Sequence, residues 1–543
     1  MRMAPRYLTV RLLTTLICAG LALSAGAQED PTRLPDLGSS ANALISPQEA
    51  QDYGAAMLRQ MRALDMVIDD AMLDDYMNDL GHRLAANSAK PKDHFSFFIV
   101  KDPVINAFAA PGGYIAVNSG LIVITRSESE LAGVISHEIG HITQNHLERA
   151  FEASKKDAPL LALVLLGAIA AGAGAGAGDG AAAVLAGGQG LIMQRQINFT
   201  RKDEVEADRA GIQTLSNSGY DPNAMADFFE RMQDTMRVGS GGDRDVPEFL
   251  QTHPVTLSRI SDAKSRAGTL IAQQKLKPTH TTLVKDQWEK STAPIIYVKD
   301  PTTLLKGSSK TDLDTYLLMR ERIRVLSGDA LQLSTYYGDN LARDKTFDTP
   351  ENHYGYALSL TRSGRGTLAA EQMQKLLKTY PGNQILQIGL ADAYLQSGQR
   401  GAALSLYAEL NRLSPRNRAI ALGYAQALVA GNSDDAIQAA NMLRPMLDDT
   451  DEPTVYRTYA RSSEKAGDPV RAGEAYADAS YLSGRPFDAM EQLKRLLKRP
   501  DLDYYARARI QARITELTPL VMELRKRRVQ TEDNPSGRDQ QLN

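Results

Sequence analysis

The sequence predicts an α+β N-terminal domain, mostly helical with a small antiparallel sheet, followed by an all-α solenoid of helical repeats. Apolar residues recur with helical periodicity over much of the first 270 residues. Short runs rich in aromatic and β-branched residues, broken by proline and glycine, interrupt that pattern between residues 94 and 117. Beyond residue 305, small residues recur at nearly constant intervals, as they do in stacked helix pairs.

Length and composition describe an ordinary folded protein with more than one core. The chain has 543 residues, of which 43% are hydrophobic and 23% charged, and single domains usually hold about 100 to 200 residues. The formal net charge is −3, which gives no support for a nucleic-acid partner.

The N-terminus has the three parts of a secretory signal peptide, so we expect the protein to be exported. These parts are basic residues, an apolar run and small residues before a cleavage site, here Arg2, Arg6 and Arg11, then Leu12 to Leu23, then Ala25 to Ala27. Cleavage after Ala27 would remove Cys18, the only cysteine, and leave a mature chain without a thiol.

Two helices and three strands are expected next. Ser46-Pro47-Gln48-Glu49 is a strong helix start, and helical periodicity runs to Ala63 and again from Asp69 to Ala86. The predicted strands are Phe95 to Val100, Asn106 to Ala109 and Tyr114 to Val117. Either of the last two could hold an extended substrate at a sheet edge. The alternative is that all three belong to a core sheet.

The pattern His137-Glu138-Ile139-Gly140-His141 lies in a predicted helix that begins at Ser127. Residues i and i+4 share one helix face, so both imidazoles can reach a single zinc ion. Glu138 would lie beside the ion, where a carboxylate can take a proton from the attacking water. Glycine at 140 lowers helix propensity, so we expect another element to pack closely there.

A third ligand is predicted on a downstream helix that carries Asp203-Glu204-Val205-Glu206-Ala207-Asp208. Glu204 and Asp208 share one face, whereas Glu206 points roughly the opposite way. We interpret Glu204 as the third zinc ligand, Asp208 as the acceptor that fixes a histidine ring, and Glu206 as a solvated or structural charge. Two histidines and one carboxylate leave a position for water, as catalytic zinc sites do.

Two further histidines are weighed against this site. His253 lies in a predicted loop, and it could be a fourth ligand in a closed state, an oxyanion stabiliser or a structural hydrogen-bonding residue. His146 follows His141 by five residues, roughly 140° further round the same helix, so we do not expect it to be a ligand.

The segment 159–190 between the ligand helices is apolar and then mostly Gly and Ala. Its length suits a membrane span, but repeated glycines weaken a free helix. We favour a loop that caps the active site or touches a membrane surface, and we keep a structural helix pair and a true span as alternatives.

The C-terminal half has the spacing of tetratricopeptide repeats. Pro381 and Pro415 are 34 residues apart. Small residues recur before and after them, at Ala357, Gly364, Ala369, Ala391, Gly398, Ala403, Ala425, Gly431, Ala436, Ala460, Gly467 and Ala472. Such repeats stack into a solenoid that binds protein segments.

Together these residues resemble a known enzyme family. His137-Glu138-x-x-His141 with Glu204-x-x-x-Asp208 is similar to the gluzincin metallopeptidases, and Glu204-x-x-Ala207-Asp208 resembles peptidase family M48. Segments 106–108, 111–115 and 118–121, and Thr252-His253-Pro254 followed by Arg259, fit as well.

The resemblance implies a gluzincin-like N-terminal domain and a zinc metalloendopeptidase with one Zn²⁺ per chain. It also implies a periplasmic location, unfolded or misassembled outer-membrane β-barrel proteins as clients, and docking of the repeats on the machinery that assembles them. The expected domains are a signal peptide (1–27), a protease domain (28–270), a connector (271–305), the repeats (306–524) and a polar tail (525–543). Two rival functions are a repeat-based chaperone or scaffold with occasional proteolysis, and a membrane-embedded M48 peptidase.

Overall fold

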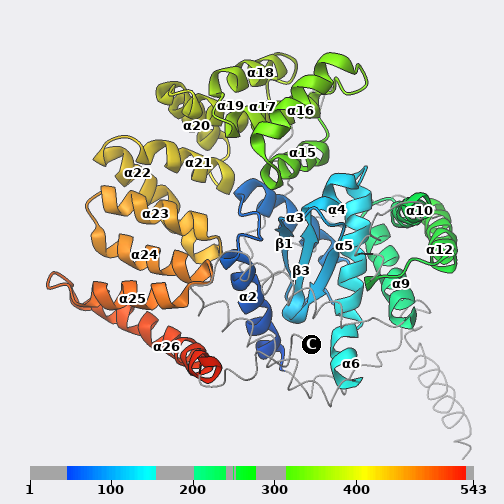
Figure 1. Ribbon diagram of the computed structural model, residues 1–543, viewed down its shortest axis with the longest axis horizontal. Coiled ribbons are helices and arrows are strands. Elements are labelled where there is room, and N and C mark those ends of the chain that lie inside the picture. The colour runs from blue at the N-terminus through cyan, green and yellow to red at the C-terminus, as the bar shows by residue number, and fades with distance from the viewer. Residues whose placement is uncertain (1–45, 154–200, 240–248, 250–251, 277–312, 533–543) are drawn as a thin grey trace, which may run out of the picture. The chain divides into compact units, whose positions relative to one another are not determined.

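The computed structural model describes residues 46–153, 201–239, 249, 252–276 and 313–532 of the chain (Figure 1). The expected signal peptide, the segment 159–190 and most of the expected connector lie outside the described residues. Among the described helices, none combines the length and the apolar character that a bilayer span requires.

Helices α2 (Pro47–Ala63) and α3 (Ala71–Ala86) begin close to their sequence signals. The Ser46 hydroxyl accepts the Glu49 N–H, and the Glu49 carboxylate accepts the Ser46 N–H at 2.8 Å. The predicted helix start at Ser46 is therefore confirmed. Asp70 caps α3 by accepting the Leu73 N–H. Helix α3 then packs on the sheet and on α5, the helix of the His-Glu motif.

The sheet has three strands, β1 (Ser96–Val100), β2 (Ala107–Ala110) and β3 (Tyr114–Asn118), in the order β1-β3-β2. The expected antiparallel sheet is wrong for one pair, because β1 and β3 are parallel, whereas β2 and β3 are antiparallel. The chain reverses direction twice between β1 and β3, and β3 then takes the central place. Strand propensity locates the strands but does not order them.

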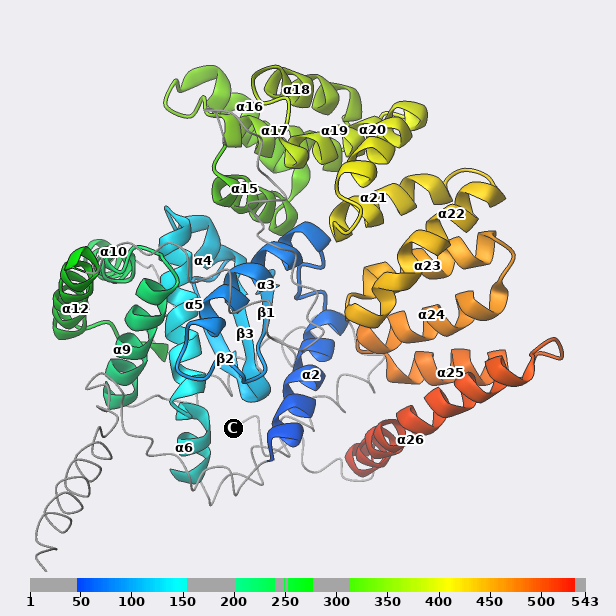
Figure 2. The same ribbon diagram turned by 180° about the vertical axis from the view of Figure 1, so that it is seen from behind.

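Six further helices belong to the described part of the N-terminal half. They are α4 (Ser119–Ile124), α5 (Glu128–Thr143), α6 (His146–Ala153), α9 (Arg201–Asn217), α10 (Asn223–Gly239) and α12 (Leu257–Leu276). Helix α5 packs against α3, α9 and α10, and also against β2 and β3 (Figure 2). Nearly all of its residues are buried. Helix α12 extends to Leu276, past the residue where we expected the connector to begin.

The start of α5 has only one half of a capping box. The Ser127 hydroxyl accepts the Glu130 N–H at the predicted helix start. The Glu130 carboxylate, however, accepts the Arg126 N–H at 2.7 Å and pairs with Arg231 of α10. The guanidinium of Arg231 draws this carboxylate toward α10, so the charge also joins the two helices.

A turn separates α5 from α6, so His146 does not continue the helix of His141 as we expected. Helix α5 ends at Thr143, and Asn145 has a φ of 53°. This left-handed conformation breaks the helical path, and asparagine tolerates it better than most residues do. The Asn145 carboxamide also accepts a hydrogen bond from Lys90 at 2.7 Å. The chain restarts as α6 at His146.

The C-terminal region consists of helices that follow one another in chain order, from α15 to α26 (Figure 1). They are α15 (Thr315–Ser327), α16 (Ala330–Arg343), α17 (Pro350–Arg362), α18 (Gly366–Thr379), α19 (Gln384–Gln396), α20 (Arg400–Leu413), α21 (Arg418–Val429), α22 (Ser433–Leu443), η3 (Arg444–Asp449), α23 (Pro453–Lys465), α24 (Pro469–Leu482), α25 (Pro486–Leu497) and α26 (Tyr504–Glu532). Helix α26 runs past residue 525, where we expected a polar tail to begin.

The regularly spaced glycines and alanines of the sequence recur at similar positions in successive helices. Each helix packs on the next, and the alternate helices α15, α17, α19, α21 and α23 also contact one another. Gly364 and Gly398 follow the ends of α17 and α19 with φ values of 80° and 78°, a conformation that favours glycine at a helix end. Ala357, Ala391 and Ala425 are fully buried, as small residues are where helices touch.

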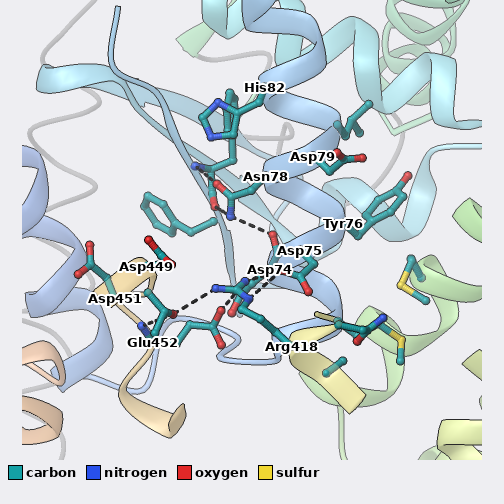
Figure 3. Close-up of a pocket in the computed structure, with 18 of the residues that line it drawn as sticks. Asp74, Asp75, Tyr76, Asn78, Asp79, His82, Arg418, Asp449, Asp451 and Glu452 are labelled. Atoms are coloured by element: carbon teal, nitrogen blue, oxygen red, sulfur yellow. Dashed lines mark hydrogen bonds and ion pairs between the residues drawn. The ribbon is translucent and has the colours of Figure 1, made fainter. Parts of the chain in front are cut away.

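Arginines of the C-terminal helices pair with aspartates around α3. Arg322 of α15 donates to both carboxylate oxygens of Asp70, at 2.8 and 2.6 Å. Arg418 of α21 lies 2.6 Å from Asp75 and 2.6 Å from Glu452 (Figure 3). Residues that are hundreds of positions apart in the sequence thus meet at the helix that supports α5.

Candidate metal centre

The site is built where α5 and α9 approach closely. A Cβ atom at Gly140 would lie 2.7 Å from the backbone oxygen of Ala207, and one at Gly211 would lie 3.0 Å from the backbone nitrogen of His137. Larger side chains at 140 and 211 would force the helices apart, which explains the glycine that sequence reasoning found costly for α5. Ala207 and Gly211 follow Glu204 by three and seven residues, so this face of α9 directs Glu204 toward His137 and His141.

Four side chains direct donor atoms to one place. Nε2 of His137 lies 3.0 Å from Nε2 of His141 and 3.4 Å from Nδ1 of His253. Oε1 of Glu204 lies 3.5 Å from Nε2 of His141 and 3.1 Å from Nδ1 of His253. The structure thus brings together His137, His141, Glu204 and His253, all of them buried.

This donor set fits a divalent zinc ion. Ligands about 2.1 Å from a tetrahedral ion lie about 3.4 Å from one another, and the separations here range from 3.0 to 3.6 Å. Glu204 and Asp208 bring negative charge to His137 in this place. Burial opposes protonation of His137, but the hydrogen bonds with Asp208 and Glu204 outweigh burial and raise its pKa to about 9.

Asp208 and Arg259 lie directly behind the donors. Oδ1 of Asp208 lies 3.0 Å from Nδ1 of His137, the ring nitrogen that faces away from the other donors. Arg259 of α12 donates to both oxygens of Asp208, each at 2.7 Å, and its third nitrogen lies 2.7 Å from Oε2 of Glu204. One buried guanidinium therefore orients the two carboxylates of α9 that share a face.

Glu138 lies beside the donor group. It is fully buried, and its Oε1 is 3.7 Å from Nε2 of His253. Burial raises its pKa, although the nearby His253 and His137 act against the shift. The pKa of Glu204 is instead well below its ordinary value, because His253 and His137 outweigh the effect of burial. Glu138 therefore accepts a proton more readily than Glu204 does.

A second polar group lies next to His141. His146 Nδ1 is 2.8 Å from His141 Nδ1, and His146 Nε2 is 3.3 Å from Glu206. Arg149 of α6 donates to Asp203 at 2.8 Å and to Glu206 at 2.7 Å. Glu206 therefore lies outside the four-donor group, as its helix position predicted, but it is held by partners and not simply solvated.

Sequence reasoning missed two residues of this region. The sequence motif includes Arg259 without indicating its role, although two carboxylates on one buried helix face require a nearby cation. Helical periodicity misplaces His146, because it assumes an unbroken helix. The Gln144-Asn145 pair before it was the available signal, since asparagine is frequent in left-handed turns.

A separate cavity of about 1050 Å³ lies against α3 and α21 (Figure 3). Asp74, Asp75, His82, Arg418 and Glu452 are among the residues that line it. None of the four donors lines this cavity, so it belongs to the contact between the N-terminal and C-terminal helices and not to the candidate metal centre.

Comparison with known proteins identifies relatives for most of the chain. The profile of peptidase family M48 matches residues 72–267, a range that includes all four donors. A putative beta-barrel assembly-enhancing protease of Vibrio cholerae is 41% identical over 264 residues, which cover 48% of this chain and 53% of that protein. The beta-barrel assembly-enhancing protease of Yersinia pestis is 35% identical over 416 residues, 73% of this chain and 81% of that protein. The protein of the same name from Escherichia coli K12 is 31% identical over 519 residues, 95% of this chain and 98% of that protein.

Proposed function

This chain belongs to peptidase family M48, and from that premise we propose a zinc metalloendopeptidase whose ion is held by His137, His141 and Glu204. The observation that carries the assignment is the convergence of these donors at separations that suit one tetrahedral ion. Zinc is favoured because two imidazoles and one carboxylate are a common donor set of catalytic zinc. We assign one ion to each chain.

Each residue then has a definite task. A zinc ion in this place would act as a Lewis acid toward the scissile carbonyl and activate a water molecule. Glu138 accepts the proton of the attacking water and delivers it to the leaving amine. Burial raises the pKa of Glu138 above its ordinary value, which helps this carboxylate to accept a proton. Asp208 and Arg259 hold the His137 ring and Glu204 in their orientations.

His253 supports a closed resting state. Its Nδ1 completes the donor group, and its Nε2 faces Glu138. We therefore favour the fourth-ligand interpretation of His253 over an oxyanion or purely structural role. The backbone N–H of His253 donates to Phe249 O at 2.7 Å and holds the ring in this place. Displacement of His253 would open the fourth position to water and substrate.

Strand β2 is the best candidate for holding an extended substrate. Strand β3 has partners on both sides, whereas β2 pairs with β3 alone among the described strands. Helix α5, which carries Glu138, packs against β2. A peptide added to the outer edge of β2 would therefore lie beside the proposed base.

The client class is inferred from the relatives. Their name describes proteases that enhance β-barrel assembly, and the chain spans 98% of the Escherichia coli protein. We propose the periplasm as the location, and unfolded or misassembled outer-membrane β-barrel proteins as substrates. The helices from α15 onward would act as tetratricopeptide repeats that dock on the β-barrel assembly machinery. We propose two functional domains, one from residue 28 to the end of α12 at Leu276 and one from residue 306 to the end of α26 at Glu532, with segment 159–190 as a point of membrane contact.

The test uses the purified mature chain and an unfolded outer-membrane β-barrel protein. We expect one zinc ion per folded chain, with cleavage that is lost on chelation and restored by added zinc. A folded, zinc-loaded chain that promotes barrel assembly but cleaves nothing would instead support the chaperone or scaffold. Release of the mature chain from membranes by salt or alkali without detergent would exclude the membrane-embedded peptidase.

A further inference from the structure

His146 lies directly behind the predicted ligand His141, on the side away from the other donors. The Nδ1 atoms of the two rings are 2.8 Å apart, and the rings meet edge to face at an interplanar angle of 78°. His146 is 1% exposed. Its other nitrogen faces α9, where Glu206 lies 3.3 Å and Asp203 lies 3.9 Å away.

We propose that His146 is a positioning residue for His141, and that it relays the charge of Glu206 to this metal ligand. The proposal rests on the proposed function, because it requires His141 to bind the ion. It assigns a task to a histidine that lies outside the four-donor group.

Only one placement of protons satisfies both rings. His141 Nε2 faces His137 and Glu204, so it must present a lone pair to the ion and keep the ring proton on Nδ1. That proton points at His146 Nδ1, which must therefore accept it. His146 then carries its own proton on Nε2 and donates it toward Glu206. The carboxylate thereby selects the tautomer of both imidazoles.

Arg149 shows that the second group is a relay and not a second metal site. His146, Asp203 and Glu206 lie close enough together to hold an ion. The guanidinium of Arg149 already contacts both carboxylates, at 2.8 and 2.7 Å. It supplies the positive charge of this group and keeps Glu206 ionised as an acceptor.

The turn at Asn145 directs the His146 ring at His141. On a continuous helix, residue 146 would lie roughly 140° round from residue 141, and the rings would not meet. Helix α5 ends at Thr143 and Asn145 has a φ of 53°, so that α6 begins with His146 beside His141. Lys90 holds this turn through the Asn145 carboxamide.

The two histidine ligands consequently have different supports. The ring of His137 is backed by a carboxylate, Asp208, whereas the ring of His141 is backed by a neutral imidazole with a carboxylate beyond it. Loss of such an outer partner typically lowers metal affinity about 10- to 100-fold. We expect a loss of that size when the His146 acceptor is removed.

The test compares His146→Phe with His146→Asn in the full-length mature chain. Phenylalanine keeps the ring volume but has no acceptor, whereas the asparagine oxygen can take the place of Nδ1. Competition with a fluorescent zinc chelator should show a 10- to 100-fold higher Kd for His146→Phe and a value closer to native for His146→Asn. Glu206→Gln should give an intermediate loss of zinc affinity, because Asp203 still lies near Nε2 of His146. Histidine-selective ¹⁵N spectra of the native chain should show His146 as the Nε2–H tautomer.

The possible outcomes separate the proposal from the proposed function. Equal zinc affinity in the native chain and a folded His146→Phe would overturn the relay, as would an Nδ1–H tautomer for His146. If the folded native chain binds no zinc and cleaves nothing, the proposed function itself fails. If His146→Phe does not fold, Glu206→Gln and the tautomer measurement decide the question.

A second pair of variants tests the turn. Asn145→Gly retains the positive φ, whereas Asn145→Val disfavours it, and both remove the contact with Lys90. Asn145→Gly should keep a zinc affinity near that of the native chain, because His146 keeps its place. The zinc affinity of Asn145→Val should be lower than that of Asn145→Gly. Equal affinities in the two variants would show that the turn does not position His146.

Discussion

Gly140 of α5 lies so close to Ala207 of α9 that a Cβ atom at residue 140 would be 2.7 Å from the Ala207 backbone oxygen. The helices that carry the predicted ligands therefore meet backbone to backbone. Small residues at 140 and 211 set the distance between His137, His141 and Glu204.

Gly140→Ala should lower stability, although alanine is the better helix former. Overpacking costs about 1–3 kcal/mol against a propensity gain of about 1 kcal/mol, and zinc affinity should fall because the helices separate. Gly268→Ala on α12 is the matched control, because no atom lies within 4 Å of its added Cβ. It should leave stability unchanged or slightly higher. Thermal unfolding of both variants checks this, and equal midpoints would contradict the packing argument.

Glu138→Gln should abolish cleavage and leave zinc in place. Removal of a general base costs about 100- to 10,000-fold in rate, and Glu138 is not one of the four donors. Proteolysis of an unfolded β-barrel protein is measured beside zinc content. Glu230→Gln on the exposed side of α10 serves as the control. A Glu138→Gln variant that retains activity would show that Glu138 is not the general base.

Glu204→Gln should lose zinc, because a neutral amide is a poor ligand for the ion. Glu206→Gln should keep the ion with weakened affinity, since Glu206 acts through His146. Metal analysis after dialysis against a mild chelator separates the two variants. The reverse result, with zinc lost from Glu206→Gln and kept by Glu204→Gln, would exchange the assigned roles.

His253→Ala should raise the rate of cleavage of a short peptide several-fold and weaken zinc binding. The reason is that His253 completes the donor group and covers Glu138. Initial rates and zinc Kd are measured together. A lower rate with unchanged zinc affinity would instead indicate an oxyanion role.

The contact between α3 and the C-terminal helices should contribute less to the free energy of unfolding as the pH rises through about 7. Burial raises the pKa of Glu452 from 4.5 to about 7, and the pKa of the adjacent Asp74 is raised by burial and by Glu452. The folded protein thus retains a proton that the unfolded chain has released. Its contribution, at most about 3 kcal/mol, is fully present below pH 4.5 and is lost through pH 7.

Glu452→Gln removes this titration and should flatten the dependence of the thermal midpoint between pH 5.5 and 8. Its carboxamide can still accept from Arg418. Glu371→Gln, at an exposed position of α18, should leave the dependence as it is in the native chain. An unchanged slope in Glu452→Gln would show that another group titrates.

Local sequence patterns sufficed for the helices that carry the candidate site. The i and i+4 spacing selected Glu204 and Asp208 over Glu206 as the residues facing α5, and the glycine at 140 indicated a close neighbour. The parallel pairing of β1 with β3 was not predictable in this way, because strand order depends on contacts that a local pattern does not contain.

Two other features depend on non-local or rare geometry. The position of His146 follows from one left-handed residue, which helical periodicity overlooks. The pairing of Arg418 with Asp75 joins residues 343 positions apart, and each residue alone looks like an ordinary surface charge.

The aspartates at the start of α3 require arginines at fixed places in the C-terminal helices. Among the described residues, Asp70 pairs with Arg322 of α15 and Asp75 with Arg418 of α21. A chimera that joined the N-terminal half to foreign C-terminal helices would leave both carboxylates without a cation unless the new helices carried arginines at equivalent places. Exchange of C-terminal helices among such enzymes is therefore restricted by charge as well as by shape.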